Sequence, residues 1–256
     1  MISNLKYDIE IFRTTDLLNK AAAKFIIEIA KESVAAKGLF IISLSGGETP
    51  KKLYQLLSQP PFHNQLPWKK TYVFWGDERC VPLKDEQNNA YQAKTILLDK
   101  TNIPTSNIFP IPVNFPPEGA ALRYEKEIIG FFGNEPPKFD LMLLGLGENG
   151  HTASLFPGTK VLEETAMGVR EVDIEAALPH SSSGTKEKFR VTMTAPLINE
   201  SHNILFMVTG GGKAEILNNV LNGMYQPNKY PAQLIHARDG AMYWFIDRAA
   251  ATLINA

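Results

Sequence analysis

Short apolar runs alternate with helix-forming stretches along the 256 residues of the chain. Several runs, such as Phe139 to Leu144, are apolar at successive positions, so both faces of the resulting strand must be covered. Strands that alternate with helices form mostly parallel sheets with helical layers on each side. This alternation predicts an α/β fold, a three-layer α/β/α sandwich with a Rossmann-like, mostly parallel sheet and helices on both faces.

The expected elements fall into one continuous series. Strands are predicted over residues 39–44, 71–75, 139–144, 190–194, 203–208 and 242–246, and helices over 16–36, from Pro50, after Gln87, from Glu118 and over 213–221. No stretch has the composition of an interdomain linker, so we expect residues 1–256 to form a single domain built on one sheet. The segment from Pro179 to Lys188 is predicted to be an exposed loop. Ligands of such sheets bind beyond the carboxyl ends of the strands, which directs attention to the segments after each strand.

Composition excludes several classes of protein. The chain has 26 Lys and Arg against 27 Asp and Glu, a formal net charge of −1, which argues against binding nucleic acid or membranes through bulk charge. One cysteine, Cys80, permits neither an internal disulfide nor a thiolate-rich zinc site. The first residues lack a secretory pattern and no apolar run reaches membrane-spanning length. We expect a soluble, cytoplasmic protein, either a monomer or a small homo-oligomer.

The first predicted strand is followed by the motif SGGETP. Gly46 and Gly47 let the backbone approach a ligand closely, Thr49 can cap the helix or donate its hydroxyl, and Pro50 suits a first helical turn. A strand, a glycine turn and a helix N-terminus present amide N–H groups to a phosphate. A helix-capping turn without a ligand is the alternative at this point.

The second predicted strand is followed by WGDERCVP. Asp77, Glu78 and Arg79 lie where ligands of such sheets bind, although a structural ion-pair network is the more common explanation for an acid pair beside an arginine. Cys80 has no base adjacent in sequence and is not expected to be a nucleophile.

The third predicted strand runs into GLGENGHTASLFPG, which satisfies G-x-G-x-x-G. Pro157 leaves no room for the long helix on which a dinucleotide pyrophosphate rests, so a nicotinamide cofactor is not expected. His151 lies at the expected ligand crevice and is a candidate base, although a lone histidine is more often structural. After the fifth strand, TGGGK places Lys213 at a helix start as a candidate anion contact, the alternative being a solvated lysine.

Taken together and in this order, SGGETP, WGDERCVP, GLGENGHTASLFPG, RVTMTAPLIN and VTGGGKAEIL resemble the bacterial 6-phosphogluconolactonases, in the superfamily that also contains glucosamine-6-phosphate deaminase/isomerase. The resemblance spans nearly the whole chain. It implies a Rossmann-like α/β/α domain that hydrolyses 6-phospho-D-glucono-1,5-lactone to 6-phosphogluconate in the pentose phosphate pathway. It implies no obligatory cofactor and no metal, and a sugar-phosphate lactone as the small-molecule partner.

The resemblance also implies roles for individual residues. His151 would be the general base, since the ordinary pKa of histidine suits proton transfer near neutral pH. Asp77 and Arg79 would orient water or the histidine and polarise the lactone. The resemblance assigns the phosphate to the loop of Ser45, Gly46, Gly47 and Thr49, to Arg190 and to Lys213.

Two positions depart from the wider superfamily. Many members carry aspartate where this chain has Asn149, and the deaminases use that aspartate as a base, which an amide cannot be. The deaminases also have an acidic residue at the position of Phe156. Both departures favour the lactonase over a sugar-phosphate deaminase or isomerase. A non-catalytic sugar-phosphate-binding protein is the third possibility, and the presence of His151 and Arg79 argues against it.

Overall fold

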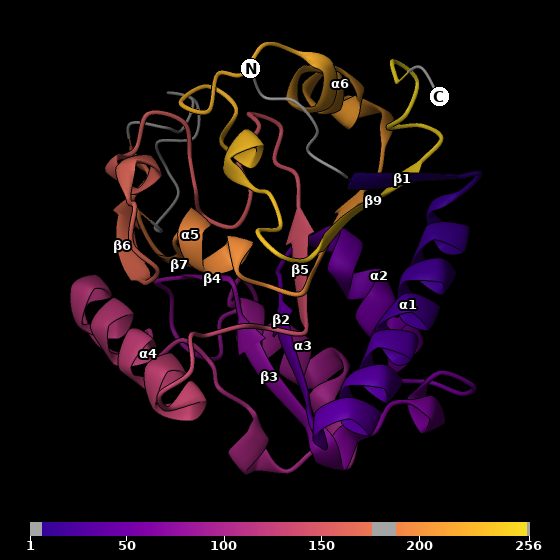
Figure 1. The fold of residues 1–256 in the computed structure, drawn as a ribbon, viewed down its shortest axis with the longest axis vertical. Helices are drawn as coiled ribbons and strands as arrows, with labels where there is room; N and C mark the ends of the chain where they lie inside the picture. The colour runs from indigo at the N-terminus through magenta and orange to yellow at the C-terminus, as the bar shows by residue number, and fades with distance from the viewer. Residues whose placement is uncertain (1–6, 176–187, 255–256) are drawn as a thin grey trace.

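The computed structural model describes residues 7–175 and 188–254 (Figure 1). The loop expected over Pro179 to Lys188 lies outside these residues except for Lys188. The strands are β1 (Tyr7–Phe12), β2 (Phe40–Leu44), β3 (Thr71–Trp75), β4 (Asp77–Arg79), β5 (Leu141–Gly145), β6 (Val169–Asp173), β7 (Phe189–Met193), β8 (Asn203–Val208) and β9 (Ala241–Asp247). The α-helices are α1 (Thr15–Lys37), α2 (Glu48–Leu57), α3 (Asn89–Ile96), α4 (Pro117–Phe132), α5 (Ala195–Asn199) and α6 (Ala214–Asn222).

The main sheet has six parallel strands in the order β1-β9-β8-β5-β2-β3. Its central strands are buried along their lengths, as their continuous apolar sequences predict. Because the strands are parallel, the segments that follow β2, β3, β5 and β8 meet at one end of the sheet. In Figure 1 this is the upper end, toward which β5 runs.

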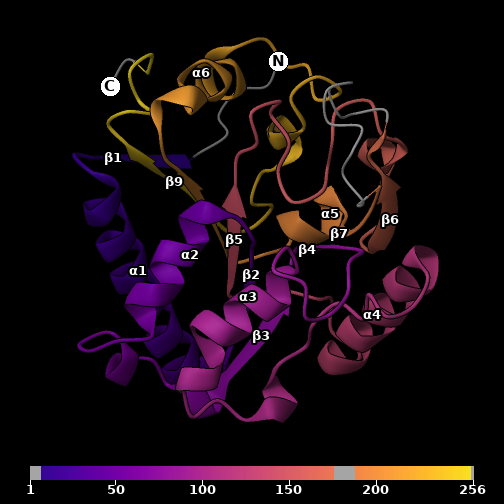
Figure 2. The ribbon, with the colours of Figure 1, turned by 180° about the vertical axis from the view of Figure 1, so that it is seen from behind.

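Helices cover both faces of this sheet. Phe25 of α1 packs edge-on against Tyr243 and Phe245 of β9, with ring centroids 4.7 Å and 5.7 Å apart. Alternate residues of a strand point to opposite faces, so Trp244 faces the other way, toward α6. Figures 1 and 2 show α1 and α2 on one side of the main sheet and α4 on the other. The predicted α/β sandwich is confirmed.

The predicted helix over 16–36 is confirmed, and a capping residue marks each of its ends. The Thr14 hydroxyl accepts a hydrogen bond from the Leu17 N–H at 3.2 Å, which caps the first turn. Gly38 ends the helix in the left-handed region, at φ 84°, and donates its N–H to the Val34 carbonyl at 3.0 Å.

The expectation of one sheet is wrong for the strand that carries Arg190. This strand, β7, pairs antiparallel with β4 and β6 in a separate three-stranded sheet in the order β4-β7-β6. Gly76 joins the two sheets, since its N–H donates to the Leu44 carbonyl at 3.1 Å and its carbonyl accepts from the Met193 N–H at 2.8 Å. The second sheet therefore lies directly after β3, next to the end of the main sheet.

Helix α4 holds the last residue of β3 in place. The Tyr124 hydroxyl accepts from the Trp75 N–H at 2.8 Å and donates to the Trp75 carbonyl at 3.1 Å. Strand β3 is an edge of the main sheet, so the tyrosine satisfies backbone groups that a further strand would otherwise pair with. This contact fixes the point from which Asp77 and Arg79 emerge.

Candidate active site

A cavity of about 440 Å³ opens at the carboxyl ends of β2, β3, β5 and β8. It collects most of the residues that the sequence singled out: Ser45, Gly46, Gly47, Thr49, Asp77, Arg79, His151 and Lys213 all line it. Asn149 and Arg190 do not line it but act on residues that do. The rule that ligands of such sheets bind beyond the strand ends is therefore met at the expected place.

The loop after β2 is shaped to expose its backbone. Gly47 adopts φ 106°, in the region that favours glycine, and directly precedes α2. The backbone N–H groups of Glu48 and Thr49, in the first turn of α2, have no hydrogen-bond partner within the helix. The Tyr54 hydroxyl donates to the Ser45 carbonyl at 2.6 Å and accepts from the Ser45 N–H at 3.2 Å, which fixes the start of the loop. Helix-initial amides in a fixed loop form a suitable anion site.

Two hydroxyl groups of this loop differ in their contacts. The Ser45 hydroxyl is buried and has no hydrogen-bond partner among the described residues. Thr49 does not cap α2, because Gly47 occupies the N-cap position; its hydroxyl instead lies 2.8 Å from that of Thr209, after β8. The loops after β2 and β8 are thus joined across the cavity.

The imidazole of His151 sits in a narrow slot. On one side the ring of Phe156 stacks on it, with centroids 4.1 Å apart and planes 19° apart. Gly147 also lies against the ring, since an added Cβ there would fall 2.0 Å from the ring carbon Cε1. Only glycine fits at this position, so the second glycine of the GLGENG motif makes room for the histidine.

Asn149 fixes the protonation pattern of His151. The asparagine Oδ1 lies 2.5 Å from the ring Nδ1 and also accepts from the His151 backbone N–H at 3.3 Å. Because this oxygen can only accept, Nδ1 carries the hydrogen and Nε2 keeps a lone pair. Burial and the nearby positive charge of Lys213 lower the pKa of His151 to about 4, so the ring is neutral at pH 7.

The carboxyl group of Asp77 lies at the start of β4. Its Oδ2 accepts from the Ser154 hydroxyl at 2.6 Å, and the Ser154 N–H donates to the hydroxyl of Thr192 at 3.2 Å. Burial raises the pKa of Asp77, against the opposing effects of the Ser154 hydrogen bond and the positive charge of Arg79. The motif that contains His151 and the strand β4 are joined by this contact.

Arg79 and Arg190 are direct cross-strand neighbours of β4 and β7. The Arg79 Nη1 donates to the Gln87 carbonyl and to the Asn89 Oδ1, each at 2.7 Å. Arg190 does not line the cavity, yet its charge favours the ionised form of Asp77 and disfavours protonation of His151. Two like charges side by side suit a site for a negatively charged ligand.

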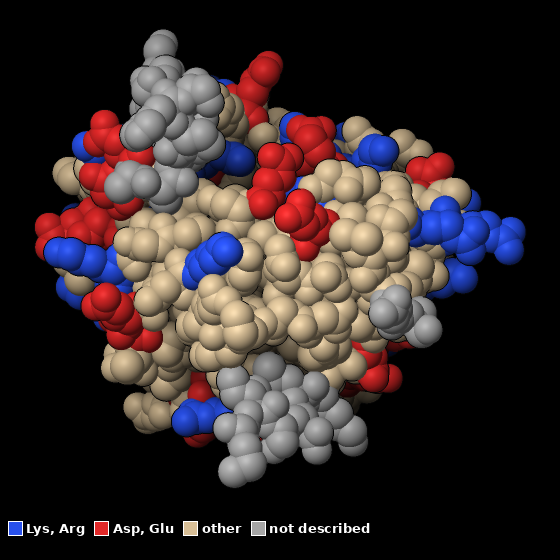
Figure 3. All heavy atoms as spheres, turned by 90° about the horizontal axis from the view of Figure 1, so that it is seen from above, with Lys and Arg blue, Asp and Glu red and all other residues tan. Residues whose placement is uncertain are grey.

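Lys213 ends the 3-10 turn Gly211–Lys213 and immediately precedes α6. The turn is held by Asp247, whose carboxylate oxygens both lie 3.1 Å from the Gly210 N–H. Burial lowers the pKa of Lys213, and the nearby Glu148 partly offsets this effect. Figure 3 views the molecule from the end where the cavity lies, and it shows charged residues of both signs scattered among uncharged ones.

The predicted site residues did not include several residues of this site, among them Asn89 and Thr209, which line the cavity, and Ser154, which bonds to Asp77. Ser154 and Thr209 lie inside quoted motifs, so their positions after strands were the available signal. Asn89 follows the predicted start of a helix, and its partners Arg79 and Gly46 are distant in sequence. Nothing local marks it.

Burial raises the pKa of the Cys80 thiol to about 11, which agrees with the expectation that it is not a nucleophile. Between β5 and β6, a stretch that the structure describes in full, the chain forms only the short 3-10 helix Lys160–Glu163 and no α-helix, in agreement with the prediction from Pro157. Across residues 7–175 and 188–254, no group of three or more His, Cys, Asp or Glu side chains is arranged to hold a metal ion. None of the helices in the same ranges is both long and apolar enough to cross a lipid bilayer.

Comparisons with known proteins agree with this geometry. A family model described as glucosamine-6-phosphate isomerases/6-phosphogluconolactonase matches residues 13–244. A 6-phosphogluconolactonase of Synechocystis is 38% identical, covering 91% of this chain and 92% of its own, and one of Haemophilus influenzae is 36% identical, covering 83% and 87%. The structure of 6-phosphogluconolactonase from Trypanosoma cruzi superposes with a TM-score of 0.85 at 28% identity, covering 99% and 98% of the two chains.

The resemblance found in the motifs is therefore confirmed over nearly the whole chain. The chain belongs to the glucosamine-6-phosphate isomerase/6-phosphogluconolactonase family.

Proposed function

We propose that this protein hydrolyses 6-phospho-D-glucono-1,5-lactone to 6-phosphogluconate, in the oxidative branch of the pentose phosphate pathway. The observation that carries the proposal is a neutral histidine, His151, whose Nε2 keeps a lone pair that can accept a proton. It lies in a cavity that also contains a loop suited to bind an anion. A lactone is an activated ester, so its hydrolysis needs a positioned water, a base and a group that stabilises the oxyanion.

In the first step His151 accepts a proton from water through Nε2 while the water oxygen bonds to the lactone carbonyl carbon. The carbonyl oxygen becomes an oxyanion, which the positive charge of Arg79 stabilises. When the intermediate collapses, the bond from this carbon to the ring oxygen breaks, and the ring oxygen takes the proton from the imidazolium. The product acid then ionises. His151 returns to its neutral form and the reaction consumes one water.

The phosphate group would be bound in the same cavity, at the glycine loop after β2. Candidate donors are the amides and hydroxyls of Ser45 to Thr49, with Lys213 and Arg190 as cations. Charge-assisted hydrogen bonds to phosphate are about twice as strong as neutral ones. Anchoring this group orients the lactone carbonyl before reaction, which is how remote binding energy lowers the barrier. This arrangement needs only a few local cations, consistent with the near-zero net charge.

Two residues favour lactone hydrolysis over deamination or isomerisation of a sugar phosphate. Asn149 is an amide whose oxygen is already engaged by His151, so it cannot shuttle a proton. Phe156 presents a hydrocarbon ring to His151 instead of a second acid.

The test is a lactonase assay with freshly generated 6-phosphogluconolactone. We expect the wild-type protein to accelerate ring opening over the spontaneous rate, and His151→Ala to lose about 10²–10⁴-fold in kcat while still binding 6-phosphogluconate. Release of ammonia from glucosamine 6-phosphate would instead establish the deaminase. Binding of 6-phosphogluconate without any acceleration of ring opening would establish a binding protein.

A further inference from the structure

Asn89, which none of the motifs above includes, lies at the centre of the polar groups in the cavity. It is the first residue of α3, its side chain is buried, and it lines the cavity beside Asp77 and Arg79.

Its carboxamide contacts three separate segments. Oδ1 accepts from Arg79 Nη1 at 2.7 Å, and Nδ2 donates to the Asp77 carbonyl at 3.1 Å. An added Cβ at Gly46 would fall 1.8 Å from the same Oδ1, so the amide packs directly on the glycine loop after β2. Both polar atoms of the amide are used, one as acceptor and one as donor.

Asn89 is itself held by the buried carboxyl group of Glu78. Glu78 is fully buried, and it accepts from the N–H of Asn89 at 2.7 Å, of Ala90 at 2.9 Å and of Arg79 at 2.8 Å. These bonds satisfy helix-initial amides and favour negative charge at that helix end. The backbone of Asn89 and that of Arg79 therefore share one anchor.

The contacts of Arg79 show what this arrangement achieves. Its Nη1 carries two hydrogens, and the Asn89 Oδ1 and the Gln87 carbonyl accept them, each at 2.7 Å. A guanidinium group is planar, so fixing Nη1 at two points fixes the plane and leaves Nη2 and Nε as donors. The N–H groups of Nη2 and Nε therefore point in fixed directions, and a ligand must lie along them to accept a hydrogen bond.

We propose that Asn89 is a positioning residue that sets the orientation of the Arg79 guanidinium in the cavity, beside the glycine loop after β2. The inference rests on the proposed function, because it gives Arg79 the negatively charged groups of the substrate and product as partners. Both polar atoms of the Asn89 amide are engaged by protein groups, so we assign it an effect through Arg79.

The experiment is a double-mutant cycle of Asn89→Ala and Arg79→Ala. Because Asn89 contributes a hydrogen bond to a charged group, we expect Asn89→Ala to lower kcat about 10–100-fold, with KM changed less than threefold. In the Arg79→Ala background the same substitution should lower kcat by less than twofold. Losses that multiply in the double variant would overturn the proposal, since they would mean that Asn89 acts independently of Arg79.

Asn88→Ala is the matched control for the folding of α3. The Asn88 side chain caps this helix by accepting from the Tyr91 N–H at 2.7 Å and does not line the cavity. We expect its removal to lower Tm and to leave kcat within twofold. If Asn88→Ala lowered kcat as much as Asn89→Ala at equal loss of Tm, the effect of Asn89 would be structural and the proposal would be wrong.

Chemical rescue provides a second readout. Added guanidinium ion should restore part of the activity of Arg79→Ala, and should restore less in Arg79→Ala/Asn89→Ala, where only the Gln87 carbonyl remains of the two acceptors. Equal rescue in both variants would contradict the inference. The same double-mutant cycle is also measured with the affinity for 6-phosphogluconate as the readout. If the wild-type protein had no lactonase activity, the proposed function would be wrong. The binding data would then still show whether Asn89 is coupled to Arg79.

Discussion

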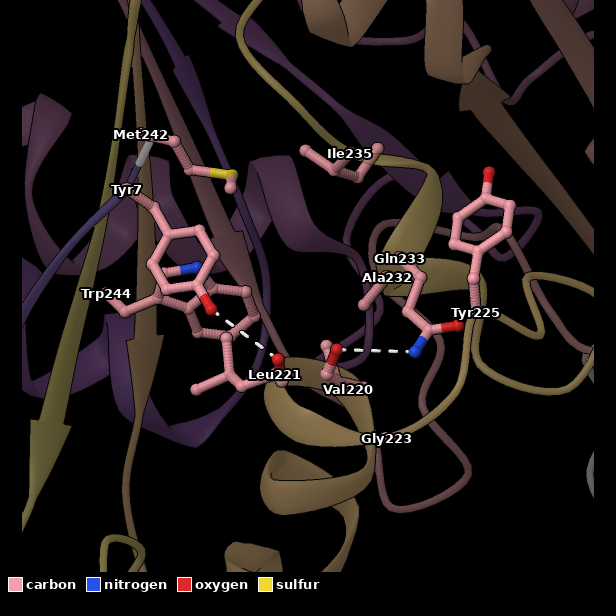
Figure 4. A pocket seen from close by; sticks show the side chains of 10 residues that line it. All are labelled: Tyr7, Val220, Leu221, Gly223, Tyr225, Ala232, Gln233, Ile235, Met242 and Trp244. Atoms are coloured by element: carbon pink, nitrogen blue, oxygen red, sulfur yellow. Dashed lines mark hydrogen bonds between the residues drawn. The ribbon is translucent and has the colours of Figure 1, made fainter. Parts of the chain in front are cut away.

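Two cavities of this molecule have the same volume, about 440 Å³, but only one of them is lined by charged side chains and a histidine. The second lies between β9 and α6, and apolar side chains such as Trp244 and Ile235 make up much of its wall (Figure 4). Two of its polar side chains bond to backbone carbonyls: the Tyr7 hydroxyl donates to the Leu221 carbonyl at 3.5 Å, and Gln233 Nε2 donates to the Val220 carbonyl at 3.3 Å. In the first cavity, polar groups converge on open space.

The difference teaches that volume does not identify a functional site. What separates the two cavities is the presence of titratable groups with shifted pKa values, since burial moves those of Asp77, His151 and Lys213 in the first. Glycine is required at Gly47 and Gly147 there because of a positive φ and a ring placed against the backbone. The following four predictions test this contrast.

The largest effect is expected from Gly147→Ala. The added methyl group would overlap the His151 ring, so the imidazole must leave its slot. We expect kcat to fall about 10²-fold or more, toward the value for loss of the base. Gly130→Ala on α4 is the control, since a Cβ there meets nothing within 4 Å. Near-normal kcat for Gly147→Ala would show that the slot does not position the histidine.

A smaller loss, in binding, is expected from Lys213→Ala and from Arg190→Ala. Lys213 lines the cavity, so its removal takes away a charge-assisted contact to the phosphate and should raise KM about 10–100-fold with little change in kcat. Arg190 does not line the cavity and acts through its charge, so its removal should raise KM by a smaller factor. Steady-state kinetics with the lactone measures it, and Lys31→Ala on the exposed face of α1 is the control. An unchanged KM in both variants would remove these cations from the phosphate site.

Asn149→Asp should shift the pH dependence and leave the neutral rate nearly intact. The base must be neutral, so kcat/KM of the wild type should fall as pH drops through the pKa of His151, which is about 4. A carboxylate beside Nδ1 favours the imidazolium and should raise that pKa by roughly 1–3 units. The acidic limb of the pH profile then moves upward. A limb that does not move would mean that another group controls it.

The smallest effect is expected in the second cavity. Tyr225 lines it and is half exposed, so Tyr225→Ala changes the wall without removing a buried contact. We expect kcat/KM within twofold of the wild type, measured in the same lactonase assay. A larger loss would show that the second cavity is coupled to the first, for instance through α6, which begins directly after Lys213.

The sequence predicted the fold best where strands are buried on both faces. β2, β5 and β8 were located because their continuous apolar sequences leave few alternatives. β4 and β6 were missed, since Asp77–Arg79 and Val169–Asp173 are short and rich in charge. They are strands because β7 pairs with both of them, and pairing partners distant in sequence leave no periodic signal.

β1 was missed for a related reason. It is an edge strand of six residues with largely exposed side chains, and its parallel pairing with β9 joins opposite ends of the chain. Arg190 was placed on a strand correctly but in the wrong sheet. Its strand pairs antiparallel with β4, which gives it Arg79 as a neighbour and brings its charge near His151.

By itself the sequence determined the α/β class, the family and the segments that carry the site, because buried strands, glycine turns and helix starts are local features. Only the tertiary structure decided which groups meet. The hydrogen bond of Ser154 to Asp77 spans 77 residues, and Asn89 reaches Arg79 and Gly46 only after α3 packs beside both loops. The low pKa of His151 likewise arises from burial and from charges on other segments. Such properties depend on distances in space, which the order of residues does not contain.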